Sequence, residues 1–387
     1  MRTARRAAEI EPFEVMDVLS RAHALERAGR HVVHMEIGEP DFTAPAPVVE
    51  AGVRALRDGR TAYTATLGLP ELREIIASHY ASRFAVSVPV ERVVVTSGAS
   101  GGLLTVTALY VDAGDEVLVP DPGYPGYRHF VRAFEGRARA LNVTAADNFQ
   151  PTAAMVRAAW GPRTKGLLLG SPSNPTGTLI ARTELAAIAA FIAERGGVLI
   201  VDEIYQGLSY GVEPWTALGL PGAVVVINSF SKYFCMTGWR LGWVVLPAGA
   251  VRGFEKLAQH LFIAAPSAAQ HAACAAFTPE SLRVLEERRG EFARRRDFLL
   301  PVLKEAGLSV PAEPHGAFYI YADCRRDARD YCMQLLEREA VAATPGVDFG
   351  ANGTERCVRF AYTRAMVDLE EAAARIRRFA AASAPSA

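Results

Sequence analysis

A series of short apolar runs, each followed directly by polar side chains, limits the folds open to this chain. The runs lie at residues 93–95, 116–119, 166–169, 198–201 and 224–228. Strands that are apolar throughout and are separated by helical patterns are typical of a parallel sheet buried on both faces. The sequence therefore predicts an α/β fold whose large domain has a mostly parallel sheet covered by helices on both faces.

The last third of the chain has a different pattern. After about residue 252 the chain becomes helical and charged, with short strands expected at 317–321 and 357–362. An earlier run at 31–37 alternates like a strand, and a helix is expected before it. We expect residues 46–285 to form the large domain. Residues 286–387, together with the N-terminal segment 1–45, are expected to form a smaller α+β domain.

Composition argues against several classes of protein. The chain has 42 basic and 42 acidic residues and no net charge, which argues against a nucleic-acid or membrane-surface role. No apolar run approaches the roughly 18 residues of a membrane span, and no secretory signal is evident. The five cysteines are scattered, which suits reduced thiols better than disulfides or a metal site. We expect a cytoplasmic protein without a metal ion.

The polar clusters that follow the strands are the candidates for a ligand site. Ligands of open α/β sheets bind outside the carboxyl ends of the strands. If these strands are parallel, all their carboxyl ends meet at one edge, and the clusters form a single site. The clusters contain Gly98, Ala99, Ser100, Tyr124, Asn174, Asp202, Tyr205, Ser229, Ser231 and Lys232.

Lys232 stands out among these residues. The chain has only four lysines, so 38 of its 42 basic residues are arginine. An arginine does not deprotonate at working pH and cannot replace a lysine that reacts as an amine. Lys232 is flanked by Ser229 and Ser231, and Arg240 follows eight residues later. An amine that forms a Schiff base, beside hydroxyls and a guanidinium that bind phosphate, is what a pyridoxal 5'-phosphate (PLP) enzyme requires. The alternative is a solvated loop lysine.

Five motifs give the chain a resemblance to a known family. They are GEPDF from Gly38, SPSNPTG from Ser171, VDEIY from Val201, SFSKYF with GWRLGW from Ser229, and VRFAY from Val358. In this order and spacing they resemble the class I and II aminotransferases, PLP enzymes of fold type I in the aspartate aminotransferase superfamily. The resemblance extends over nearly the whole chain. It implies transfer of an amino group from an L-amino acid to a 2-oxo acid such as 2-oxoglutarate or pyruvate, by a homodimer with shared active sites.

The resemblance also implies a role for each candidate residue. Lys232 would hold PLP and transfer the proton, and Asp202 would pair with the pyridinium nitrogen. Tyr205 and Asn174 would hydrogen-bond the phenolic oxygen, and Tyr124 would stack on the ring. The phosphate would be bound by Gly98, Ala99, Ser100, Ser229, Ser231 and Arg240.

Four further residues receive roles from the same resemblance. Arg359 would hold the α-carboxylate of the substrate in a two-pronged contact, close to Asn174. Gly38 would let that carboxylate approach the backbone. Tyr63, and with it Ser267, would reach the phosphate in the neighbouring subunit.

The substrate side chain is expected to be neutral. No lysine or arginine occurs between residues 101 and 127, and the segment 260–269 lacks one as well. The N-terminal residues Phe13, Val15 and Met16 are available to line an apolar pocket. An arginine that reaches the pocket, such as Arg5 or Arg6, would instead indicate an aspartate or dicarboxylate aminotransferase.

Two other readings stay open at this point. A PLP-dependent C–S lyase would use the same cofactor residues. A non-catalytic PLP-binding regulator would need an added DNA-binding domain and a basic arm, neither of which the sequence contains.

Overall fold

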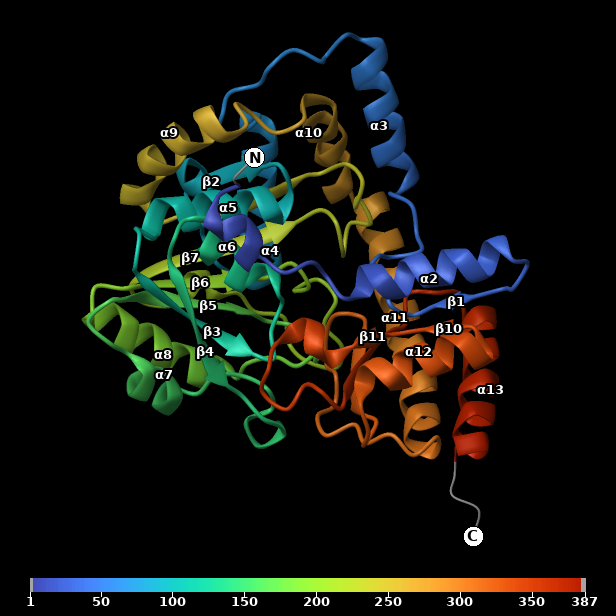
Figure 1. The fold of residues 1–387 in the computed structure, drawn as a ribbon. Coiled ribbons are helices and arrows are strands. Elements are labelled where there is room, and N and C mark those ends of the chain that lie inside the picture. The colour runs from blue at the N-terminus through green and yellow to red at the C-terminus, as the bar shows by residue number, and fades with distance from the viewer. Residues whose placement is uncertain (1–2, 384–387) are drawn as a thin grey trace.

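A seven-stranded sheet forms the larger part of the molecule in the computed structural model, which describes residues 3–383 (Figure 1). The strand order is β2-β8-β7-β6-β5-β3-β4. β8 is antiparallel to both of its neighbours, and the other six strands are parallel to one another. The strands are β2 (Val93–Thr96), β3 (Glu116–Asp121), β4 (Arg137–Asn142), β5 (Thr164–Gly170), β6 (Val198–Asp202), β7 (Ala223–Ser229) and β8 (Gly242–Val245). The predicted mostly parallel sheet is confirmed.

Helices cover both faces of this sheet. One face packs against α5 (Gly98–Tyr110), α6 (Gly126–Ala133) and α9 (Val251–Leu261). The other packs against α7 (Ala153–Ala159) and α8 (Arg182–Glu194). Successive residues of a strand alternate between the two cores, so that Ile200 lies in one, and Leu199 and Val201 lie in the other. Burial on both faces explains why these strands are apolar throughout.

Three more helices extend the large part of the molecule. They are α3 (Ala46–Arg57), α4 (Pro70–Phe84) and α10 (Ser267–Cys274). A proline in the first turn starts both α3 and α4, at positions where the missing N–H is not needed. α3 packs against α10 and lies at the periphery in Figure 1.

A smaller α+β region completes the predicted fold class. Its antiparallel sheet has the order β11-β12-β9, and β1 pairs in parallel with β10. The strands are β1 (Val33–His34), β9 (Tyr319–Asp323), β10 (Val341–Ala342), β11 (Thr344–Pro345) and β12 (Cys357–Ala361). The helices are α2 (Val15–Arg27), α11 (Pro279–Glu305), α12 (Ala328–Glu339) and α13 (Met366–Ser383). The short helix α1 (Arg5–Glu9) lies instead against α6 of the large part, where Glu9 pairs with Arg132 and Arg6 with Glu135. The exact domain boundaries stay a prediction.

Several elements differ from the sequence-based expectation, among them the two-residue strands β10 and β11, which were not predicted. The strand expected over 31–37 is limited to two residues, because its partner β10 has only two. The strand expected at 317–321 begins two residues later. β4 was not predicted, because it is a mostly exposed edge strand and therefore has no apolar run. Across residues 3–383, we find no helix that has both the length and the apolar character needed to span a membrane.

Candidate active site

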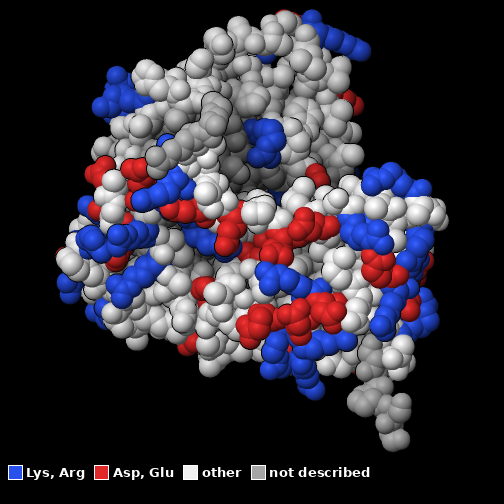
Figure 2. Space-filling model, viewed as in Figure 1, with Lys and Arg blue, Asp and Glu red and all other residues white. Residues whose placement is uncertain are grey.

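A cavity of about 520 Å³ lies where the parallel strands end. The molecular surface in Figure 2 is hollowed above a belt of mixed acidic and basic side chains. Twelve of the residues assigned to the cofactor or to the substrate carboxylate line the cavity: Gly38, Ala99, Ser100, Tyr124, Asn174, Asp202, Tyr205, Ser229, Ser231, Lys232, Arg240 and Arg359. Five parallel strands and β12 therefore bring their polar residues to one place.

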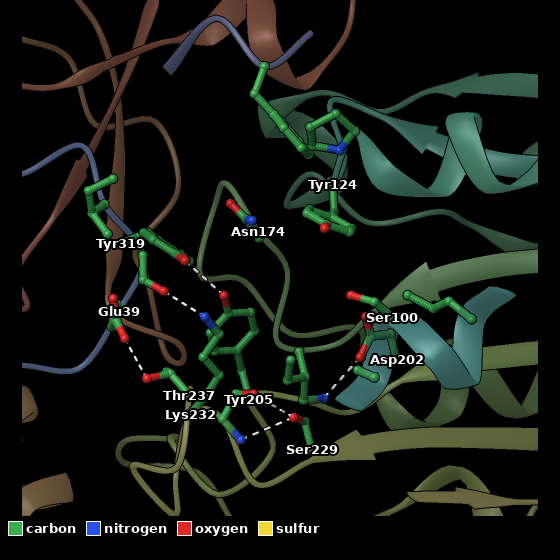
Figure 3. Close-up of a pocket in the computed structure, with 18 of the residues that line it drawn as sticks. Glu39, Ser100, Tyr124, Asn174, Asp202, Tyr205, Ser229, Lys232, Thr237 and Tyr319 are labelled. Atoms are coloured by element: carbon green, nitrogen blue, oxygen red, sulfur yellow. Dashed lines mark hydrogen bonds between the residues drawn. The ribbon is translucent and has the colours of Figure 1, made fainter. Parts of the chain in front are cut away.

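Lys232 lies just after β7, whose buried residues fix the start of this loop. Its Nζ donates a hydrogen bond to the carbonyl oxygen of Gly38 at 2.6 Å and lies 5.9 Å from the ring centre of Tyr205 (Figure 3). Burial lowers the pKa of Lys232 to about 8, with a further contribution from the nearby Arg359. A lysine with such a pKa has an appreciable fraction of neutral, nucleophilic amine near neutral pH.

Asp202 ends β6 and is only 4% exposed. Its carboxylate accepts hydrogen bonds from the backbone N–H of Ile204 at 3.1 Å and from the hydroxyl of Tyr127 at 2.9 Å. Burial raises the pKa of Asp202 to about 6, although both hydrogen bonds oppose that rise. A buried carboxylate at this position would be stabilised by a cationic partner in the cavity.

Hydrogen-bond donors converge at the start of α5. Gly98 has a left-handed φ of +74°, and a Cβ atom there would lie 2.8 Å from Nη2 of Arg240. Glycine therefore lets the guanidinium lie against the first turn of the helix. The hydroxyl of Ser229 donates to that of Ser231 at 2.9 Å beside this turn. Backbone N–H groups of a first turn, hydroxyls and a guanidinium are together suited to binding an anion.

Arg359 is held firmly on β12 at the opposite side of the cavity. Its Nη1 donates to Oδ1 of Asn174 at 3.0 Å, and its Nη2 donates to the carbonyl oxygen of Glu36 at 2.5 Å. Its Cζ lies 4.4 Å from the ring centre of Tyr319 and 4.9 Å from that of Phe349. The guanidinium is therefore fixed between two aromatic rings, a suitable position for binding a carboxylate.

Two tyrosines of the site were not found in the sequence. Tyr127 donates to Asp202, and the hydroxyl of Tyr319 lies 2.7 Å from that of Tyr205. Tyr127 follows Tyr124 by three residues, and its backbone N–H donates to the carbonyl oxygen of Tyr124 just before α6, which brings the two ring centres within 5.3 Å. That spacing was a signal that sequence reasoning passed over. Tyr319 gave no such signal, since a tyrosine in an apolar strand resembles ordinary core.

Gly38 is explained by a contact that the sequence did not indicate. A Cβ atom at this residue would overlap the hydroxyl of Tyr319. The packing of Tyr319 therefore requires glycine at this position, independently of any contact between Gly38 and the substrate carboxylate.

Three residues assigned to the site, Gly98, Tyr63 and Ser267, lie outside the cavity lining. Gly98 lies beneath Arg240. Tyr63 is 81% exposed, and the hydroxyl of Ser267 donates to the neighbouring carbonyl oxygen of Ala62 at 2.6 Å. The role of Tyr63 in a neighbouring subunit stays a prediction.

The N-terminal segment reaches the cavity only in part. Phe13 and Val15 line it as expected. The expectation for Met16 is wrong, because its side chain is exposed and does not line the cavity. Arg5 and Arg6 do not line it either, since they form ion pairs with acidic residues on α1 and after α6.

Comparisons with known proteins agree with this arrangement. A family model described as aminotransferase class I and II matches residues 30–376. Valine–pyruvate aminotransferase of Mycobacterium tuberculosis is 39% identical over 380 residues, covering 97% of both chains. The (5-formylfuran-3-yl)methyl phosphate transaminase of Methanocaldococcus jannaschii is 36% identical over 379 residues, covering 97% of this chain and 99% of that protein.

A solved structure extends the likeness to three dimensions. The crystal structure of an aminotransferase from Mycobacterium tuberculosis matches with a TM-score of 0.94 at 38% identity, covering 99% of this chain and 100% of that chain. The family match covers most of the chain, and these relatives match nearly its whole length. The chain therefore belongs to the class I and II aminotransferases, a family of PLP-dependent enzymes that transfer amino groups between amino acids and 2-oxo acids.

Proposed function

We propose that this chain binds PLP on Lys232 and transfers the amino group of a neutral L-amino acid to a 2-oxo acid. One observation carries the proposal. A single cavity contains an amine of lowered pKa, a buried carboxylate and a set of anion-binding donors. These are the groups that PLP needs for its aldehyde, its ring nitrogen and its phosphate. Because Gly98 has no side chain, the guanidinium of Arg240 reaches the first turn of α5, where it would join the backbone N–H groups in binding a phosphate.

Each residue of the cavity has a physical task in this proposal. When bound, PLP supplies an aldehyde for the amino group and a ring that takes up electrons from the substrate. Lys232 holds the cofactor, and its amine then removes and returns the proton at the α-carbon. Its pKa of about 8 suits a general base and acid near neutral pH. Asp202 keeps a proton on the ring nitrogen, and Tyr205 with Asn174 hydrogen-bonds the phenolic oxygen.

The remaining residues bind and orient. Tyr124 covers the face of the ring. The backbone N–H groups of Ala99 and Ser100 bind the phosphate, together with the hydroxyls and guanidinium described above. Arg359 binds the α-carboxylate common to all amino acids.

The charges of the cavity support a neutral substrate side chain. Among the described residues that line it, the cationic ones are Lys232, Arg240 and Arg359, and the mechanism assigns each of them to the cofactor or the α-carboxylate. No cation of the cavity lining is then left for a second carboxylate, and Phe13 and Val15 offer an apolar wall. The name of the Mycobacterium tuberculosis relative, valine–pyruvate aminotransferase, points the same way. We therefore include pyruvate among the proposed acceptors.

A comparison of donors tests the preference. Purified enzyme is assayed with alanine, valine, methionine, phenylalanine, aspartate and glutamate, with pyruvate as acceptor and then with 2-oxoglutarate. The proposal predicts a higher kcat/KM for at least one neutral donor than for either dicarboxylate. A higher kcat/KM for aspartate than for every neutral donor would contradict it and would favour the aspartate aminotransferase alternative.

The proposal includes a homodimer with shared active sites. The side chains of Val49, Val53 and Leu56 form an exposed apolar stripe on α3. Exposed Leu261 and Tyr63 add to the apolar surface outside that helix. Large exposed apolar patches mark interaction surfaces, and a second copy of this chain would cover this one.

Sedimentation velocity tests the dimer. The double variant Val53→Glu/Leu56→Glu is expected to sediment as a monomer, because each glutamate would be buried without a partner in the interface. Val367→Glu, at an exposed apolar position on α13, serves as the control and is expected to stay dimeric. A monomeric unmodified protein would refute the dimer.

The cytoplasmic location stays a prediction.

A further inference from the structure

Tyr319 contacts both halves of the cavity. Its side chain is 1% exposed on β9, and its hydroxyl lies 2.7 Å from that of Tyr205 (Figure 3). The face of its ring covers the guanidinium of Arg359, with the Cζ atom 4.4 Å from the ring centre. One side chain therefore touches a residue assigned to the cofactor and a residue assigned to the substrate.

The local structure holds Tyr319 in this position from two sides. In the pairing of β9 with β12, Tyr319 lies opposite Ala361, which makes Arg359 its diagonal neighbour. On the other side, Gly38 leaves room for the hydroxyl, because any side chain there would overlap it. Strand register fixes the ring on Arg359, and the glycine allows the hydroxyl to reach Tyr205.

The two hydroxyls have one proton each, so the direction of their hydrogen bond matters. Within residues 3–383, the hydrogen bond with Tyr205 is the one that the hydroxyl of Tyr319 forms. If Tyr319 donates, the proton of Tyr205 stays available to an acceptor in the cavity. Successive hydrogen bonds polarise one another, so Tyr205 then becomes a stronger donor.

We propose that Tyr319 is a positioning residue with two separable roles. Its hydroxyl donates to Tyr205 and directs the proton of Tyr205 toward the phenolic oxygen of the cofactor. Its ring holds the guanidinium of Arg359 flat for the α-carboxylate of the substrate. The inference rests on the proposed roles of Tyr205 and Arg359, and it adds a residue that links them.

The test separates the hydroxyl from the ring in the holoenzyme. Tyr319→Phe removes only the hydroxyl, and Tyr319→Leu removes the aromatic face as well. Two readouts are taken for each variant: the pH midpoint of the visible absorption of bound PLP, and the Kd of propionate at a fixed pH, followed by the same absorption. Tyr321→Phe is the matched control, because it removes a buried hydroxyl from the same strand outside the cavity lining.

The two variants have different expected results. Tyr319→Phe raises the pH midpoint by roughly 0.5 to 1 unit, the equivalent of one neutral hydrogen bond, and leaves the Kd of propionate within about twofold. Tyr319→Leu gives a similar shift and also weakens propionate binding by roughly 3- to 30-fold, the range of a lost cation–π contact. The control leaves both readouts unchanged.

Other outcomes overturn the inference. An unmoved pH midpoint in Tyr319→Phe refutes the role of the hydroxyl, and an equal loss of propionate binding in both variants refutes the role of the ring. If Tyr319→Phe does not fold, Gly38→Ala is used instead, because its methyl group would push the Tyr319 hydroxyl away from Tyr205 without removing it. This variant must then also raise the pH midpoint. An unmodified enzyme without visible PLP absorption would instead overturn the proposed function, and this inference with it.

Discussion

Replacement of Arg359 gives a prediction whose size follows from the structure. Arg359→Met removes the guanidinium but keeps an unbranched side chain between the rings of Tyr319 and Phe349. The carbonyl oxygen of Glu36 loses one donor but keeps the hydroxyl of Thr344 at 3.0 Å. The variant therefore leaves no unpaired backbone group at that carbonyl, and its main effect is expected on substrate binding.

The magnitude depends on two hydrogen bonds to a charged group. Each is worth about 1.5–3 kcal/mol, so the loss of both costs about 3–6 kcal/mol and lowers kcat/KM by roughly 10² to 10⁴. Arg359→Lys keeps the positive charge and one of the two contacts, and is expected to lower kcat/KM by roughly 10- to 100-fold. Because every amino acid carries an α-carboxylate, kcat/KM is expected to fall by a similar factor for all donors.

The assay compares kcat/KM of both variants for alanine, valine, phenylalanine and aspartate. Arg356→Met serves as the control, because Arg356 lies three residues earlier and pairs with Asp323 at the surface. It is expected to stay within about twofold of the unmodified enzyme. A loss of less than about threefold in Arg359→Met, or a factor that differs more than about tenfold among donors, would refute the role of Arg359.

Three further predictions concern the amine of Lys232, the buried ion pairs of Arg295 and the partly buried His79. Lys232→Arg keeps the charge but loses the reactive amine, so the visible absorption of bound PLP and the transaminase activity should both disappear. Lys256→Arg, on the surface of α9, should retain both. Retained activity in Lys232→Arg would refute the role of the Lys232 amine. Arg295 is 3% exposed and is paired with two carboxylates, so Arg295→Met should lower the free energy of unfolding in urea by about 3–5 kcal/mol. Arg294→Met, at the exposed neighbouring position, should change that free energy by less than about 1 kcal/mol. Equal effects of the two variants would contradict the prediction. Burial lowers the pKa of His79 to about 4, so below about pH 6.5 the unfolded chain binds a proton that the folded protein does not. The free energy of unfolding should therefore fall by at most about 3 kcal/mol as the pH drops from 6.5 to 4, and His79→Phe should reduce that fall. An unchanged pH dependence of urea unfolding in His79→Phe would contradict this prediction.

The fold was predictable where burial acts on both faces of a strand. β6 and β7 are apolar at successive positions because both of their faces are covered, and such runs are plain in the sequence. β4 is exposed along most of its length and alternates arginine with alanine, so its pairing with β3 depends on the sheet edge and not on its own pattern. The length of β1 is likewise set by its partner.

The site was predictable where its residues follow strands. Asp202 ends β6 and Lys232 lies three residues after β7, and the parallel sheet brings those ends together. Tyr127 and Tyr319 were missed for a physical reason. Their hydroxyls matter only because particular side chains lie opposite them, and that placement depends on helix packing and on the register of β9 with β12.

A single-turnover experiment tests whether Lys232 and bound PLP carry out the first half of an amino-group transfer. Purified enzyme with bound PLP is mixed with the best neutral donor and no 2-oxo acid, and the 2-oxo acid released is counted per active site. The account predicts one equivalent with concurrent loss of the visible absorption, recovery of that absorption when pyruvate is added, and no release by Lys232→Ala. Continuous release of 2-oxo acid with ammonia would indicate a lyase, and equal release by Lys232→Ala would contradict the assignment of the reactive amine.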